Sequence, residues 1–117
     1  MTRIFYAVTA TLPDEQTARE YLAWLEDGHV DAVIDAGAHS GMIVRLDPGA
    51  PGMVPGCPGG AAPGSPRPRV ETQYVFATRE RFDRYVQRDA PALRADGLKR
   101  FPPERGIVFA RRTGVIV

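Results

Sequence analysis

The chain has 117 residues, of which 44% are hydrophobic and 25% are charged, and its formal net charge is +1. This length suits a single domain over residues 1–117 with a real core, and the balanced charge gives no support to a nucleic-acid-binding protein. The only cysteine, Cys57, excludes an internal disulfide, and no apolar run approaches the length of a bilayer span. We therefore expect a soluble, cytoplasmic protein without a membrane partner.

Charge is distributed unevenly along the chain. Residues 1–64 carry three basic and eight acidic residues, a net charge of −5, whereas the remainder carries twelve and six, a net charge of +6. Such asymmetry favours pairing within the chain or between subunits over binding of a polyanion.

The first half of the chain predicts a strand and then a helix. Residues 3–11 are rich in β-branched and aromatic types, as in strands. Pro13 suits a first helical position, and the residues after it show apolar side chains at helical spacing: Ala18, Tyr21, Leu22 and Leu25. Gly28 is expected to end this helix, and a further short helical turn is expected to end at Gly37.

The second half repeats these units in another order. Residues 38–47 predict a strand that Gly41 weakens. Residues 48–68 contain seven prolines and six glycines, which predicts a mobile loop between neighbouring strands. A strand is expected over residues 69–78 and a helix from Arg79, which Pro91 should kink and in which Asp89 should cap the following segment. Pro102 ends the helix, and residues 107–117 predict the last strand.

The element order is therefore β-α-β-β-α-β, which defines an α+β, ferredoxin-like fold with two helices on one face of a four-stranded antiparallel sheet. The first, third and fourth strands are apolar on both parities. Because two helices cover only one face, the second face needs another cover. We expect this cover to be a second copy of the chain, in a homodimer that packs sheet against sheet.

The candidate site residues converge on the space between the sheet and the first helix. His29 continues the apolar stripe of that helix and could act as an acid–base group or a ligand contact, or simply satisfy terminal carbonyls. Trp24 lies beside the stripe, as a core residue, a dimer contact or a ligand contact. Tyr6 and Tyr74 could present hydroxyls to a pocket, with Arg45 or Arg111 binding an anionic group.

Other chemistry has little support in the sequence. His29 and His39 lack a third ligand at a diagnostic spacing, so we expect no metal site, and Cys57 has no partner residues nearby. The chain has no phosphate-binding loop, nucleophile elbow or paired-cysteine motif, so we expect no cofactor. The RNA-recognition module shares this topology, but residues 69–76 lack its glycine-containing consensus.

Three segments of the chain together resemble a known family: residues 21–30, with Trp24 and His29; Gln73-Tyr74; and residues 89–102. They are similar to small bacterial proteins of domain-of-unknown-function family 4286, and the most specific run is Gly97-Leu98-Lys99-Arg100-Phe101-Pro102. The resemblance implies a ferredoxin-like fold of the dimeric α/β-barrel type and no established activity. A histidine is frequent in the family where this chain has Asp89, which could replace it in a site as a carboxylate.

Three functional hypotheses follow. The first is a homodimer of uncharacterised role that binds a small organic molecule between sheet and helices, through Tyr6, Trp24, His29, Arg45 and Tyr74. The second is a cofactor-independent monooxygenase or isomerase that acts on an aromatic or polyketide-like substrate, with His29 or Asp89 as the catalytic group. The third is a non-enzymatic interaction or regulatory module.

Overall fold

The computed structural model describes residues 2–47 and 67–117, so most of the predicted loop over residues 48–68 lies outside the described residues. The four predicted strands and both helical regions are present, in the predicted order. Each helical region consists of two helices joined by a wide turn. The elements are β1 (Ile4–Thr11), α1 (Glu15–Trp24), η1 (Leu25–His29), α2 (Val30–Asp35), β2 (Ser40–Arg45), β3 (Arg69–Phe76), α3 (Arg79–Arg84), η2 (Tyr85–Asp89), α4 (Ala90–Arg100), η3 (Pro103–Arg105) and β4 (Val108–Val115).

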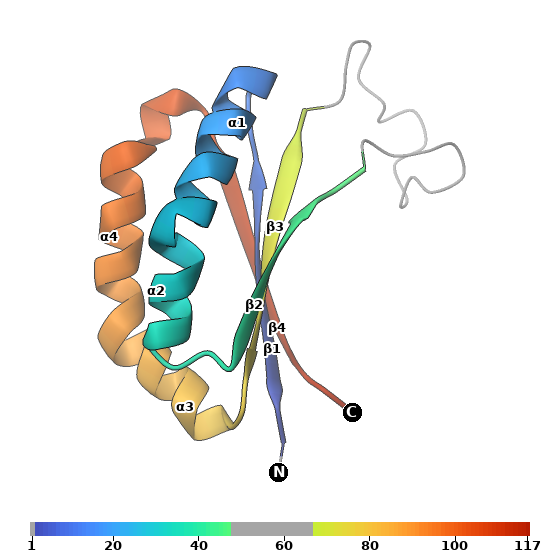
Figure 1. Ribbon diagram of the computed structural model, residues 1–117, viewed down its shortest axis with the longest axis vertical. Helices are drawn as coiled ribbons and strands as arrows, with labels where there is room; N and C mark the ends of the chain where they lie inside the picture. Colours follow the sequence, from blue (N-terminus) through green and yellow to red (C-terminus); the bar gives the residue numbers. More distant parts are fainter. Residues whose placement is uncertain (1, 48–66) are drawn as a thin grey trace.

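The four strands form one antiparallel sheet in the order β2-β3-β1-β4. The central strands β1 and β3 are paired in full register, from Ile4 opposite Phe76 to Thr11 opposite Arg69. Figure 1 shows both helical regions on one side of this sheet, which is seen nearly edge-on, and no described helix on the other side. The topology and the layering are those of a ferredoxin-like α+β fold, which confirms the prediction.

The first helical region begins at Glu15, two residues after Pro13, so the prediction that Pro13 is the first helical residue is wrong. The Asp14 carboxylate accepts a hydrogen bond from the backbone N–H of Thr17 at 2.7 Å, so Asp14 caps α1 from outside the helix. Gly28 has φ +128°, a conformation that favours glycine, and it interrupts the helix as predicted. The chain resumes at once in α2, and the Val30 N–H donates across the interruption to the Leu25 carbonyl.

The second helical region bends where Pro91 predicts a kink. Its turn widens so that the Ala90 N–H donates to the Tyr85 carbonyl, five residues back, and Pro91 then begins α4. The expected cap by Asp89 is wrong, because its side chain makes no capping hydrogen bond. The backbone at Asp89 is itself helical (φ −103°, ψ −36°), so the helix runs through this position. The capping residue of this region is Thr78, at the start of α3.

The core lies between the helices and the face of the sheet that they cover. One cluster gathers around Ile4, Tyr74 and Phe76, and a second gathers around Leu12, Leu25 and Phe101. Gly41 brings β2 close to both layers: a Cβ atom on it would lie 2.8 Å from Val30 Cγ1 and 3.1 Å from the Tyr74 ring. The glycine that weakens this strand in sequence terms therefore permits its close packing.

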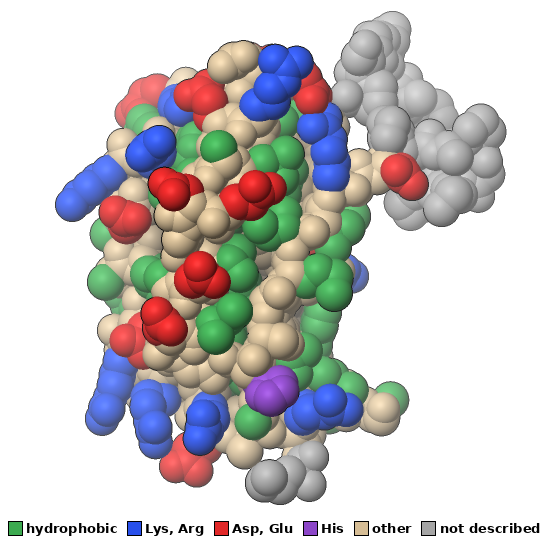
Figure 2. Space-filling model, in the orientation of Figure 1, with side chains coloured by type: hydrophobic (Ala, Val, Ile, Leu, Met, Phe, Trp, Pro, Cys, Tyr) green, Lys and Arg blue, Asp and Glu red, His purple; other side chains and the backbone are tan. Residues whose placement is uncertain are grey.

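The predicted charge asymmetry is visible on the surface. Figure 2 shows acidic side chains spread over the helical side of the molecule and basic side chains gathered toward its ends. Among the described residues, one ion pair joins the acidic first half to the basic second half: Glu20 with Arg105, at 3.1 Å. A second pair, Glu71 with Arg112, lies within the second half. None of the helices in the described part of the chain has the length and apolar character that a bilayer span needs.

Candidate functional site

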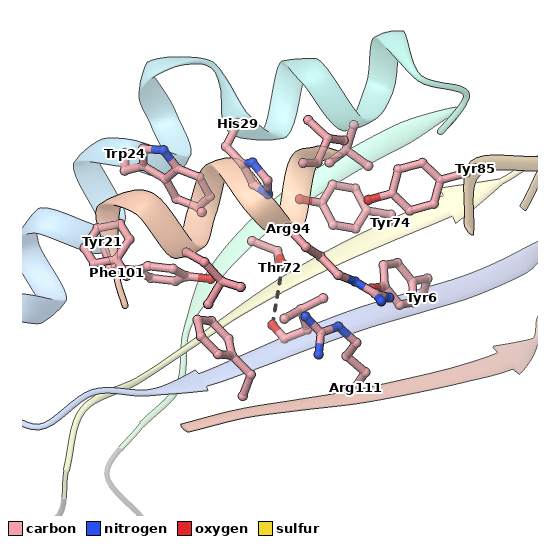
Figure 3. Close-up of a pocket in the computed structure, with 16 residues that line it drawn as sticks. Tyr6, Tyr21, Trp24, His29, Thr72, Tyr74, Tyr85, Arg94, Phe101 and Arg111 are labelled. Carbon is pink, nitrogen blue, oxygen red and sulfur yellow. Dashed lines mark hydrogen bonds between the residues drawn. The ribbon is translucent and has the colours of Figure 1, made fainter. Parts of the chain in front are cut away.

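A cavity of about 340 Å³ lies between the helices and the covered face of the sheet. Its walls come from α1, η1, α2, η2 and α4 on one side and from β1, β3 and β4 on the other (Figure 3). The lining is mainly aromatic and aliphatic and includes no acidic side chain: Tyr6, Val8, Tyr21, Trp24, His29, Val33, Thr72, Tyr74, Tyr85, Leu93, Arg94, Gly97, Leu98, Phe101, Phe109 and Arg111.

The sheet side of the cavity follows from strand alternation. Tyr6 and Tyr74 are directly opposite in the β1–β3 pair, so both side chains point to the helical side, and their rings stack with centroids 6.1 Å apart. Arg111 lies opposite Val8 in the β1–β4 pair and therefore points to the same side. Alternation thus brings two tyrosines and an arginine from three adjacent strands to one cavity wall.

The helical side is organised around Trp24 and His29. Their rings stack with centroids 4.0 Å apart and planes inclined by 23°. Trp24 also packs on α4, where a Cβ atom at Gly97 would lie 3.2 Å from the indole. Burial lowers the pKa of His29 below its ordinary value of 6.5, although the nearby Asp96 carboxylate acts in the opposite direction. His29 is therefore mainly neutral at neutral pH.

The run at residues 97–102, which is the most specific part of the family resemblance, forms part of this wall. Gly97 makes room for the indole of Trp24, and Leu98 and Phe101 line the cavity. The Phe101 ring meets the Trp24 ring edge-on at 5.6 Å. Lys99 and Arg100 are exposed and do not line the cavity. The apolar members of the run therefore shape the cavity.

The buried polar groups of the cavity are tyrosine hydroxyls and the hydroxyl of Thr72, which donates to the Val8 carbonyl at 3.5 Å. Tyr74 is 2% exposed, and its hydroxyl has no hydrogen-bond partner among the described residues. Burial raises the pKa of Tyr74 to about 12, although the nearby Thr72 side chain acts in the opposite direction without meeting hydrogen-bond geometry. Burial also raises the pKa of Tyr21 to about 12 and raises that of Tyr85. These hydroxyls stay protonated at neutral pH and are available as hydrogen-bond donors.

The structure brings together four of the sequence-predicted site residues: Tyr6, Trp24, His29 and Tyr74 all line the cavity. Arg45 does not, because it lies on β2 and pairs with Glu15 of α1 at the surface. Asp89 does not line it either. Arg111, the alternative to Arg45, does.

Sequence reasoning missed Tyr21, Tyr85, Arg94 and Phe101 as cavity residues. Tyr21, Tyr85 and Phe101 have the helical spacing of apolar side chains, and such spacing does not distinguish a filled core from a cavity wall. Arg94 carries no sequence signal at all. Among residues 2–47 and 67–117, no three His, Cys, Asp or Glu side chains gather in a way that could hold a metal ion.

An antiparallel β2-β3-β1-β4 sheet with helices on one face, and a cavity between the layers, places the protein in the ferredoxin-like class. Its family can be stated as well. The chain belongs to the family described as Domain of unknown function (DUF4286), whose model matches residues 3–115. No curated protein sequence matches the chain.

Solved structures of other proteins share this fold. A dimeric ferredoxin-like protein from an uncultured marine organism aligns with a TM-score of 0.66 and 14% identity, covering 100% of this chain and 97% of its own. An ethyl tert-butyl ether d (ethd) family protein from Bacillus halodurans aligns with a TM-score of 0.64 and 14% identity, over 100% of both chains. SnoaB, a cofactor-independent oxygenase from Streptomyces nogalater, aligns with a TM-score of 0.53 and 9% identity, over 98% and 91%. At such identities the likeness concerns the fold alone.

Proposed function

We propose that this protein binds a small, largely apolar organic molecule in the cavity between its helices and its sheet. The observation that carries the proposal is the combination of an aromatic-lined cavity of about 340 Å³ with a buried, unpartnered Tyr74 hydroxyl in its wall. The volume lies at the lower end of the range for small-molecule sites, which are mostly apolar with a few polar groups. An unpaired buried hydroxyl costs free energy that a ligand with an acceptor atom can recover.

The chain's only tryptophan makes this proposal directly measurable, because Trp24 forms part of the cavity wall. We expect the neutral dye N-phenyl-1-naphthylamine to become fluorescent in the presence of the protein and to quench Trp24. Val8→Phe should weaken dye binding, since Val8 lines the cavity and a larger side chain fills it. Ala92→Phe is the matched control, on the exposed surface of α4. Dye binding that is absent, or unaffected by Val8→Phe, contradicts the proposal.

We also propose that two copies of the chain associate through the uncovered faces of their sheets. That face carries exposed or half-buried apolar side chains around a polar centre, including Phe5, Met42, Val75 and Val108, and Met42 and Val108 are each 58% exposed. Two of the structurally similar proteins are described as dimeric. Sedimentation should give twice the chain mass, and Met42→Glu combined with Val108→Glu should give the monomer. A wild-type protein that is monomeric at micromolar concentration contradicts this arrangement.

A second candidate function is cofactor-independent chemistry at the same cavity, and the position of His29 favours it. A neutral imidazole in an apolar cavity wall can accept a proton from an acidic C–H or O–H group of a bound aromatic molecule. The oxygenase SnoaB shares the fold, which alone carries little weight for activity. The test is exchange of the acidic C–H protons of 2-tetralone in D2O, followed by NMR. His29→Gln should abolish protein-dependent exchange, and exchange that is equal in both proteins removes His29 as the base.

A further inference from the structure

The charged side chains that line the cavity are all positive. Two arginines, Arg94 and Arg111, line it beside the mainly neutral His29, and none of its lining residues is Asp or Glu. The molecule as a whole is nearly neutral, with 15 basic and 14 acidic residues, so this local excess of cations reflects their placement and not the composition. A cavity that is apolar inside and positively charged at one side favours an anionic ligand over a cationic one.

The two arginines reach the cavity from opposite layers. Arg94 belongs to α4 and Arg111 to β4. Figure 3 shows their guanidinium groups turned toward the same side of the cavity, near Tyr6. Two cations that converge in this way repel one another, and the repulsion is relieved when an anion lies between them.

Both arginines are exposed residues at the side of the cavity, and neither forms an ion pair within the part of the chain that the structure describes. The ion pairs found there use other arginines: Arg45 with Glu15, Arg84 with Glu80, Arg105 with Glu20, and Arg112 with Glu71. Arg111 has an aromatic neighbour instead, with its guanidinium carbon 6.0 Å from the centre of the Phe109 ring. Planar guanidinium groups bind carboxylates and similar oxyanions through paired hydrogen bonds, so this pair offers the appropriate donors.

The remaining polar groups are hydrogen-bond donors too. The Tyr74 hydroxyl is buried without a partner, and the Tyr85 hydroxyl stays protonated because burial raises its pKa. Donors and cations without any carboxylate in the lining suit a ligand that contributes the acceptors. The apolar residues between them, such as Leu93 and Phe101, suit a flat hydrocarbon body.

We propose that the cavity selects aromatic molecules that carry one anionic group, such as an aromatic carboxylate, with the ring among the aromatic side chains and the anion between Arg94 and Arg111. This inference rests on the proposed binding function and deepens it, because it names the class of ligand. It also gives Arg111 a binding role and assigns one to Arg94, for which the sequence offered no signal.

The experiment compares two dyes with the same ring skeleton. 8-Anilinonaphthalene-1-sulfonate carries a sulfonate, whereas N-phenyl-1-naphthylamine is neutral. We expect the wild type to bind the anionic dye more tightly, and the double variant Arg94→Gln, Arg111→Gln to bind it about tenfold more weakly while its affinity for the neutral dye is unchanged. Added salt should weaken the anionic dye only.

Two controls make the result specific. Arg81→Gln with Arg88→Gln removes two arginines that do not line the cavity, and these changes should leave both affinities unchanged. Arg94→Lys with Arg111→Lys keeps the charge and should restore part of the preference for the anionic dye. The thermal unfolding of each variant shows whether it is folded.

The outcomes separate this inference from the proposed function. If the neutral dye binds and the double glutamine variant retains the affinity of the wild type for the anionic dye, the inference is wrong and the cavity is an apolar site with solvated arginines at its edge. If neither dye binds, the proposed binding function fails together with the inference.

Discussion

The two faces of the sheet use the same residue types in different ways, and Arg111 and Arg112 show the contrast most directly. These neighbours on β4 point to opposite faces. Arg112 donates to the Glu71 carboxylate on the uncovered face at 2.9 Å, whereas Arg111 lines the cavity on the covered face and takes part in none of the ion pairs described. Arg112 therefore stabilises the fold, whereas Arg111 is available to the proposed ligand.

On the uncovered face, the buried Glu71 carboxylate has hydrogen-bond donors for both of its oxygens. Glu71 is only 3% exposed, and its oxygens accept hydrogen bonds from Thr9 at 2.6 Å, Gln73 at 2.7 Å and Arg112. Burial raises the pKa of Glu71, but these hydrogen bonds outweigh burial and leave the pKa below 4.5. On the covered face the buried Tyr74 hydroxyl has no partner among the described residues. The Glu71 carboxylate on the uncovered face is thus hydrogen-bonded within the protein. The Tyr74 hydroxyl on the covered face is available to the proposed ligand.

The sharpest test of this contrast substitutes the two arginines in turn. Arg112→Ala should lower the free energy of unfolding by about 2–3 kcal/mol, because it removes a charged hydrogen bond from a buried carboxylate. Arg111→Ala should change stability little, since it breaks no ion pair among the described residues, and should weaken binding of the anionic dye instead. Urea unfolding and dye titration measure the two effects. Equal stability losses in both variants would remove the distinction between the faces.

The pH dependence of stability provides a further check on Glu71. Because the folded state lowers its pKa, Glu71 contributes stability that is present above its unfolded pKa and is lost as the pH falls through its folded pKa. In Arg112→Ala the pKa of Glu71 rises, so the loss should begin at a higher pH than in the wild type. Unfolding curves recorded between about pH 3 and pH 7 would show this displacement.

A second prediction concerns close packing around Gly41 on β2. Gly41→Ala should destabilise the protein by about 2 kcal/mol, because the new Cβ atom would meet Val30 at 2.8 Å and the Tyr74 ring at 3.1 Å. Gly114→Ala on β4 is the control, since nothing lies within 4 Å of the corresponding position, and it should be neutral or slightly stabilising. Thermal unfolding of the two variants measures the difference. Equal midpoints would show that β2 can move aside.

A third, smaller effect follows from the unpartnered hydroxyl. Tyr74→Phe should raise the free energy of unfolding by about 1 kcal/mol, since it removes a buried donor that lacks an acceptor, and should weaken ligand binding. Tyr85→Phe serves as the comparison, because its hydroxyl is not among the buried groups without a partner. A gain in stability with a loss of binding is expected for Tyr74 alone. Destabilisation by Tyr74→Phe would show that the hydroxyl is already satisfied.

Much of this organisation could be predicted from strand alternation. A period of two residues places Tyr6 and Tyr74 on the same face once β1 and β3 are paired, and it separates Arg111 from Arg112. The edge strand was less predictable, because the position of Arg45 on β2 depends on its ion pair with Glu15 across the layers. Pairing between distant residues is not encoded in a local pattern.

The helices were harder to predict because each contains an interruption that changes its phase. The wide turn between Tyr85 and Ala90 holds five residues, so side chains beyond it no longer follow the helical spacing of α3. Arg94 therefore reaches the cavity although extrapolation from residues 79–84 does not place it there. At the other interruption Gly28 also changes the phase, yet His29 still lines the cavity. His29 therefore reaches the cavity through a kink and not through a continued helix.

The smallest predicted effect is the pH dependence that His29 contributes. Burial is the main cause of its lowered pKa, so the unfolded chain binds a proton more readily than the folded protein. The contribution of His29 to stability is therefore present above pH about 6.5 and is lost as the pH falls through its folded pKa. The Asp96 carboxylate opposes this effect. His29→Gln should remove this part of the decline between about pH 7 and pH 5, as measured by urea unfolding. His39→Gln, in the turn before β2, is the control and should leave the decline in place. A decline that is unchanged in His29→Gln contradicts this prediction.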